Sequence, residues 1–373
     1  MKRQIVCGLA VLALCAMCGW ERPVGAVADG NRVCLGVFEL SEVSGAAMLP
    51  GNRLLAVTDE DKGVYLLEHV SQKLLSERLT ITDKDGLLNN DSIKLDDLED
   101  VALAWDGMSA EYDVYLVTSH SRNREGIEKP KRDQIVRLHA GTDGELKVLN
   151  SEPPGKLKKA MTGRLKSALE RTPAQSGFNI EGAAWDPQGQ LILGLRSPTT
   201  TISRKERDNE DAIVVRLKNP GAIFNNDPLQ IQKVSLRLAG QGIRGMCFDN
   251  QLNGYWILSG LSPDPNYEVK DNWGLWFWDG TASGDGKQPD TYAVGNSPSE
   301  VMVPLAARRH LDCPEAVCRI DIDGQSYLLL IADGGKASFS KYALIPTPNS
   351  PLRPEPPSLV APRASQATRL TTR

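Results

Sequence analysis

Histidine is scarce in this chain of 373 residues, which contains only His69, His120, His139 and His310. The sequence also lacks the short motifs of several enzyme classes. It has no GxSxG turn of the α/β-hydrolases, no HExxH zinc motif, no P-loop and no GxGxxG turn after a strand. An enzyme built on this chain would therefore depend on carboxylates, arginines, a metal ion or His120.

Long apolar runs are nearly absent as well, and the one present runs from Ile5 to Trp20. It follows Lys2 and Arg3 and precedes small residues up to Ala28, which is typical of a secretory signal peptide over residues 1–28. The run is short for a transmembrane helix, so we predict no membrane span. The chain is expected to be secreted or periplasmic, with Cys15 and Cys18 leaving a lipid anchor open.

The chain has no excess of positive charge. Its formal net charge is −4, and removal of residues 1–28 would leave −6. Nucleic acid and anionic membranes attract basic surfaces, so neither is expected as a partner. Cysteine is sparse beyond the leader, where only Cys34, Cys247, Cys313 and Cys318 remain. They allow three disulfide pairings among which the sequence does not choose, and they form no CxxC zinc motif.

The stretch GFNIEGAAWDPQGQLILGLRSP, from Gly177 to Pro198, predicts a β-hairpin. Its apolar positions alternate, and Asp-Pro-Gln-Gly supplies the residues of a tight turn. Glu181 and Arg196 stand at the two outer ends of this hairpin. Because those ends lie side by side, we expect the two side chains to face the same way.

The hairpin recurs. Similar stretches begin at Val43, Leu98, Ile243 and Pro314, and superposing all five places Ser44, Glu99, Glu181, Arg244 and Glu315 at one position. Hairpins repeated at irregular intervals of this size indicate an all-β fold, a β-propeller of five or six blades. The domain is predicted over residues 29–346, before a disordered Pro-rich tail at 347–373. Asn31 to Leu40 is expected to pair with Ser338 to Ile345 and close the ring.

One short helical insertion is predicted from Gly155 to Thr172, where apolar residues recur at helical spacing. Its apolar stripe consists of Leu157, Met161, Leu165, Ala168 and Leu169.

Innermost propeller strands run along the central channel, so the starts of the hairpins should surround one channel mouth. The five superposed positions supply charged groups there, with Glu42 and Asp100 close by. The hairpin ends add Asp59, Glu60, His120, Arg122, Arg196 and Asp333. Three carboxylates around one axis repel each other unless something compensates their charge.

Three kinds of compensation are open. Arg196 and Arg244 would neutralise the carboxylates in a ring of ion pairs that fixes the blades. Alternatively Ca²⁺ would bind them, with Glu315, Asp59 and Asp333 as predicted ligands. In the third interpretation Arg196, Arg244 and Arg122 bind an anionic substrate, since guanidinium groups match phosphate and carboxylate.

The stretches IEGAAWDPQGQLILGLRSP, LEDVALAWDG with VYLVTSHSR, and IADGG resemble a bacterial β-propeller family known only as a domain of unknown function. That family is similar to the esterase-like-activity-of-phytase propellers. The resemblance covers roughly Val33 to Ile345 and implies an exported propeller. It would place function near Glu99, Glu181, Glu315, His120 and Arg196. Ser44 and Arg244 depart from a uniform carboxylate motif.

Two functions therefore compete. The first is a metal-assisted phosphoester or ester hydrolase acting at the central funnel, with Glu181, Glu99 and His120 as catalytic residues and Ca²⁺ as a cofactor. The second is a non-catalytic, monomeric propeller that binds a small anionic ligand or a protein at the same mouth. Propellers serve both purposes, so the fold does not decide between them.

Overall fold

The computed structural model of the chain separates Met1–Arg32 from a compact unit, Val33–Arg373. Within the second unit it describes residues 33–347 apart from gaps at 50–52, 60–61, 71–72, 80–81, 84–85, 88–94, 106–110, 124, 142–144, 154, 171–176, 201–210, 262–272, 288–291 and 334–338. The predicted signal peptide at 1–28 lies outside these residues, as does the predicted tail beyond Thr347.

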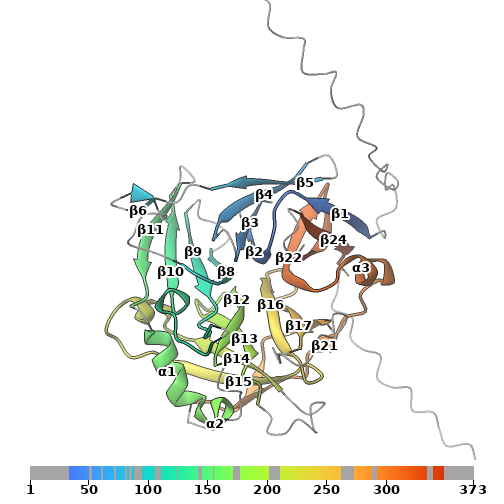
Figure 1. Ribbon diagram of the computed structural model, residues 1–373. Helices are drawn as coiled ribbons and strands as arrows, with labels where there is room; N and C mark the ends of the chain where they lie inside the picture. The colour runs from blue at the N-terminus through green and yellow to red at the C-terminus, as the bar shows by residue number, and fades with distance from the viewer. Residues whose placement is uncertain are drawn as a thin grey trace, which may run out of the picture. The chain divides into compact units, whose positions relative to one another are not determined.

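The strands of the described part of the chain form five sheets, each of which is one blade of a propeller (Figure 1). Blade 1 consists of β2 (Val43–Leu49), β3 (Arg53–Thr58), β4 (Val64–Val70) and β5 (Lys73–Arg78). Blade 2 consists of β8 (Leu98–Ala104), β9 (Tyr112–Thr118), β10 (Ile135–Ala140) and β11 (Leu146–Ser151), with β6 (Thr82–Asp83) and β7 (Gly86–Leu87) beyond β11.

The remaining blades follow in chain order. Blade 3 consists of β12 (Asn179–Trp185), β13 (Leu191–Ser197), β14 (Asp211–Leu217) and β15 (Ile231–Arg237), with β20 (Ala293–Gly295) and β19 (Ala282–Ser283) beyond β15. Blade 4 consists of β16 (Gly242–Asp249), β17 (Gly254–Gly260), β18 (Trp273–Trp278) and β21 (Ser299–Glu300). Blade 5 consists of β22 (Pro314–Ile322), β23 (Gln325–Ala332), β24 (Ser340–Pro346) and β1 (Cys34–Phe38).

The five inner strands, β2, β8, β12, β16 and β22, each contact the next around a common centre (Figure 1). The ring is closed by β1, which pairs with β24 from Cys34 opposite Leu344 to Phe38 opposite Ser340. The predicted propeller and its closing strand are therefore confirmed. Of the five or six blades expected, the structure has five, and the described residues of 138–177 and 280–310 form outer strands and short helices.

The core consists of five apolar clusters, one at each interface between neighbouring blades. Alternate residues of a strand point to opposite faces of its blade, so one strand serves two clusters. On β13, Leu191, Leu193 and Leu195 face blade 2, while Ile192 faces blade 4. This is why the middle strands of blade 3 read as nearly continuous apolar runs.

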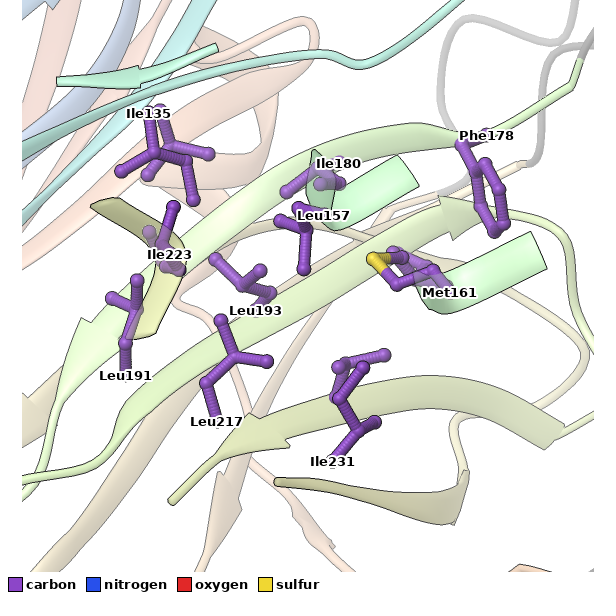
Figure 2. Packing of buried hydrophobic residues seen from close by; sticks show 14 of the residues in the cluster. Ile135, Leu157, Met161, Phe178, Ile180, Leu191, Leu193, Leu217, Ile223 and Ile231 are labelled. Atoms are coloured by element: carbon purple, nitrogen blue, oxygen red, sulfur yellow. The ribbon is translucent and has the colours of Figure 1, made fainter. Parts of the chain in front are cut away.

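Within the described residues, five short helices accompany the blades: η1 (Pro130–Arg132), α1 (Lys156–Arg164), α2 (Lys166–Leu169), η3 (Pro220–Phe224) and α3 (Leu305–His310). Helices α1 and α2 are the predicted insertion, and Leu157, Met161, Leu165 and Ala168 of the predicted stripe are buried. Figure 2 shows Leu157 and Met161 beside Ile180 and Leu193 of blade 3. The insertion therefore covers the interface between blades 2 and 3. Helix α3 was not predicted.

Truncating Leu157 tests this packing. Leu157 is fully buried, so Leu157→Ala should lower the free energy of unfolding by about 2–5 kcal/mol. Leu149, which is 49% exposed on β11, provides the matched control, and Leu149→Ala should cost less than about 1 kcal/mol. Urea denaturation of both variants measures the difference. Equal losses would contradict the packing described for α1.

Candidate functional site

Each inner strand carries a β-bulge at the same place. The pairing register shifts across one residue in all five hairpins, and the bulged residues are Ser44, Glu99, Glu181, Arg244 and Glu315. These are the five positions that superposition of the sequence repeats brought together. A bulge re-aims the side chain of its extra residue, so the five side chains depart together from the regular strand direction.

Two ion pairs join the residues of this channel mouth. Arg196 Nη1 lies 2.6 Å from Glu181 Oε1, which also accepts a hydrogen bond of 2.7 Å from the amide of Asn179. Arg244 forms an ion pair with Glu315 of the neighbouring blade. Glu181 and Arg196 were expected to face the same way, and in the structure they form an ion pair.

Several contacts at the mouth also link neighbouring blades. Ser44 Oγ donates to the carbonyl oxygen of Leu98 at 2.6 Å and so connects blade 1 to blade 2. Arg196 Nε donates to the carbonyl oxygen of Leu261 at 3.2 Å, which connects blade 3 to the end of blade 4. With the ion pair of Arg244 and Glu315, these bonds join blades 1 and 2, 3 and 4, and 4 and 5 at the mouth.

Glu99 differs from the other mouth carboxylates. Its half-buried carboxyl has no hydrogen-bond partner among the described residues. Burial raises its pKa well above the ordinary range, and the charges of Glu181, Asp97 and Asp59 raise it further, against a smaller opposing effect of Arg196. The neutral, protonated form of Glu99 is therefore favoured.

The two arginines respond differently to their burial. Burial disfavours the charged form of Arg196, but the charge and hydrogen bond of Glu181 outweigh it and raise the pKa. Burial lowers the pKa of Arg244, and the charge of Arg196 lowers it further. Arg196 and Arg244 are thus close enough to repel each other.

Four buried polar atoms of the mouth lack a hydrogen-bond partner in the described part of the chain: Glu42 Oε2, Asn179 Oδ1, Glu181 Oε2 and Arg244 Nε. Buried polar atoms are nearly always paired, so each such exception asks for an explanation. Water or the polar groups of a small ligand would satisfy these atoms. Three of these atoms are hydrogen-bond acceptors and one is a donor. A ligand that satisfies all of them would therefore need both donors and acceptors.

An acidic region adjoins the mouth in blades 1 and 2. Asp97 accepts hydrogen bonds from Arg132 Nη1 at 2.9 Å and from Ser121 Oγ at 2.8 Å. Burial and the charge of Asp97 raise the pKa of Asp59 to about 6, although Arg132 opposes the shift. Sequence analysis missed Asp97 and Arg132. The acidic run before Glu99 could have pointed to Asp97, but it does not indicate that Arg132 is the partner of Asp97.

His120 and Arg122 each contact a glutamate outside the five bulge positions. The fully buried imidazole of His120 lies 2.9 Å from the carbonyl oxygen of Thr118 and 3.4 Å from Glu152 Oε2. Arg122 Nε donates to Glu128 at 2.8 Å. None of these contacts involves Glu99 or Glu181, so they give no support to the catalytic and substrate-binding roles predicted for the two residues.

The residues predicted to bind calcium do not form an obvious cation site. Glu315 is paired with Arg244, and Asp59 lies near Arg132. Asp333 follows β23 directly, and it is half-buried at the end of blade 5 where Pro314 pairs with Ala332. No group of three or more His, Cys, Asp or Glu side chains suited to a metal occurs among the described residues. Interleaved guanidinium groups do not fit a calcium site, and calcium stays a sequence prediction.

The opposite end of the inner strands encloses a cavity of about 890 Å³. All five inner strands contribute to its wall, and Trp105, Trp185, Phe248 and Arg319 lie around it. Arg319 Nη1 donates to Asp249 at 3.0 Å. This cavity lies at the far end of the inner strands from the ion pairs.

Residues 155–341, half of the chain, match the family model described as protein of unknown function (DUF3616). The chain belongs to this family. The predicted membership of a propeller family of unknown function is thus confirmed, whereas the likeness to phytase-type propellers is not shown. No curated protein sequence matches the chain. No helix among the described residues is long and apolar enough to cross a membrane.

Solved structures with a similar fold include a GH43 β-1,3-galactosidase with galactodeoxynojirimycin, at 10% identity and a TM-score of 0.46, covering 82% of this chain and 90% of that chain. Another is a PQQ-bound aldose sugar dehydrogenase from Streptomyces coelicolor, at 14% identity and a TM-score of 0.38, covering 84% and 98%. A third is a GH43_1 enzyme from Xanthomonas citri, at 11% identity and a TM-score of 0.41, covering 82% and 88%. Likenesses this distant carry no argument about activity.

The raised pKa of Asp59 predicts a pH-dependent stability. The folded state holds the proton more tightly than the unfolded state, so ionisation of Asp59 costs stability as the pH rises from about 4 to above 6. Asp59→Asn removes that cost. The variant should gain stability over the wild type at pH 7.5 but not at pH 3.5, as measured by urea denaturation. An equal gain at both pH values would show that ionisation of Asp59 is not the cause.

Proposed function

We propose that the channel mouth is the active site of a hydrolase, with Glu99 as general acid and Glu181 as the partner carboxylate. The observation that carries the proposal is the contrast between these two bulged residues of neighbouring blades. Glu181 is paired with Arg196 and Asn179, while Glu99 has no hydrogen-bond partner among the described residues. Carboxyl groups in contrasting environments are a common basis for acid and base roles.

The chemistry would divide between the two groups as follows. A protonated Glu99 would donate its proton to the leaving group as the bond breaks. Glu181 is paired with Arg196 through Oε1, and its Oε2 has no protein partner among the described residues, so this oxygen remains available to a water molecule or to substrate.

The arginines define the substrate class. Arg244 has a buried Nε without a partner in the described part of the chain, and Arg196 lies beside it. Guanidinium groups match phosphate and carboxylate oxygens, so a small substrate with an anionic group is favoured. The step assigned to Glu99 needs no metal, and Ca²⁺ remains a separate hypothesis that the assay includes.

The competing function is capture of a small anionic ligand, or of a protein, without turnover. The ion pairs and inter-blade hydrogen bonds favour it, because a mouth fixed in this way provides a preorganised binding site. A binding protein should show no hydrolysis, while its ligand should raise the melting temperature.

Export is proposed on the signal-peptide pattern of residues 1–28, which places the site outside the cytoplasm. Expression of the full chain with its leader, followed by intact-mass measurement of the periplasmic and secreted fractions, tests the proposal. Loss of residues 1–28 supports it. An uncleaved chain confined to the cytoplasm contradicts it.

Substituting the two carboxyls tests the hydrolase. Phosphomonoesters, phosphodiesters and carboxyl esters are assayed with added Ca²⁺ and with a chelator. Removing a general acid lowers rates by roughly 10²–10⁴-fold, so Glu99→Gln should lower kcat to that extent, and Glu181→Gln should lower it as well. Glu300→Gln, an exposed glutamate on β21, is the matched control and should retain full activity.

Each result has a definite meaning. Turnover unchanged in a folded Glu99→Gln variant would remove Glu99 from the mechanism. Absence of turnover on every substrate, together with a melting temperature raised by an anion from the panel, would replace the hydrolase with the binding function. Activity abolished by the chelator would restore the calcium hypothesis.

A further inference from the structure

One equivalent position of the five inner strands lies in the cavity wall and differs in residue type between blades. The residues three places after the bulges are Ala47, Ala102, Ala184, Cys247 and Cys318, and all five line the cavity of about 890 Å³. Small side chains suit this narrow part of the channel. The two cysteines occupy the position in the neighbouring strands β16 and β22, which pack against each other.

The two thiols are neighbours. Cys247 and Cys318 lie close enough for their side chains to interact, and both are free thiols in the structure. Cys313 lies at the other end of the channel, near the guanidinium groups of Arg196 and Arg244. Cys34 is on the outer closing strand β1. The described structure thus favours one of the pairings that the sequence left open.

We propose that Cys247 and Cys318 are a redox-active pair that forms a disulfide between blades 4 and 5 when a small disulfide enters the cavity. The proposal does not depend on the hydrolase. Cys247 is 8% exposed and Cys318 is 2% exposed, so Cys247 is the thiol that the cavity presents first.

The reaction is a thiol–disulfide exchange in two steps. Cys247 loses its proton, and the resulting thiolate attacks one sulfur of the small disulfide and releases a small thiolate. Cys318 then loses its proton and attacks Cys247 in the mixed disulfide, which releases the second small thiolate. The two cysteines lose two electrons, and the small disulfide gains them.

The cross-link would act on the propeller as a whole. Residues 247 and 318 are 71 positions apart, and closing a loop of that size restricts the unfolded chain considerably. The bond would also add a covalent link between two blades that the nearby ion pair of Arg319 with Asp249 already joins. The neighbouring thiol of Cys318 and burial raise the pKa of Cys247, so exchange in the folded protein should be slow.

The experiment uses the purified full chain, first reduced and then incubated overnight with oxidised glutathione. Peptide mapping under non-reducing conditions should find Cys247 linked to Cys318. Trypsin leaves Cys313 and Cys318 in one peptide, because no Lys or Arg separates them. The Cys313→Ser variant therefore assigns the bond, and it should give the same cross-link as the wild type.

Thermal unfolding provides the second measurement. Oxidation should raise the melting temperature by several degrees, and dithiothreitol should reverse the rise. Cys247→Ala and Cys318→Ala should both abolish the shift, and alanine already occupies this position in blades 1 to 3. Cys34→Ala is the matched control and should retain the shift.

Two outcomes would overturn the proposal. The first is a stable glutathione adduct on Cys247 without closure to Cys318, because it would show that the second thiol does not reach the first. The second is recovery of unmodified Cys247 and Cys318 from protein in which Cys34 or Cys313 has reacted.

Discussion

The close approach of five inner strands around one axis is the constraint on which the rest of the structure depends. A Cβ atom at Gly245 would lie 2.1 Å from the carbonyl oxygen of Glu315, and one at Gly182 would lie 2.9 Å from Ile243 Cγ2. The residue after each bulge must therefore be small, and Gly45 and Ala316 meet the same condition. Asp100 is the exception. Its buried carboxyl lies against Gly45 and accepts the backbone N–H groups of Val101 and Ala183.

The bulges determine the chemistry of the mouth. Each one turns its extra residue out of the regular strand, so the five extra residues come to equivalent positions around the channel. The pairs Glu181–Arg196 and Arg244–Glu315 are largely buried, and buried ion pairs contribute little net stability because both charges lose their hydration. The partnerless atoms of Glu181 and Arg244 reduce that contribution further. Stability alone therefore gives a poor account of these charges, which favours binding or catalysis.

Local patterns predicted the elements of this fold well. The alternation in Gly177–Pro198 identified a hairpin, and aligning such hairpins located the five bulged residues without any knowledge of the bulges. The stripe of Leu157 and Met161 identified the inserted helix because it requires only a periodicity of 3.6 residues. Blade number was harder, since the strands β19, β20 and β21 are too short to carry a pattern.

Choice of partner could not be predicted from local patterns. Glu181 binds the arginine of its own hairpin, whereas Glu315 binds Arg244 of the preceding blade, and only the spacing between blades decides which occurs. His120 shows a second limit. It occupies the expected end of its hairpin, but its backbone is left-handed, with a φ of 55°, and its imidazole lies against Glu152. The left-handed conformation at His120 thus accompanies a contact with Glu152 in place of the site that its sequence position suggests.

The ring of small residues also separates the two ends of the channel. The charged mouth lies at the bulges, the crowded ring with Asp100 lies one residue further, and the thiols of Cys247 and Cys318 lie two residues beyond that. Burial raises the pKa of Asp100 well above its usual range, and the backbone N–H groups it accepts oppose this only in part. The charge of an ionised Asp100 would also raise the pKa of Cys247, so the ring couples the two ends of the channel electrostatically.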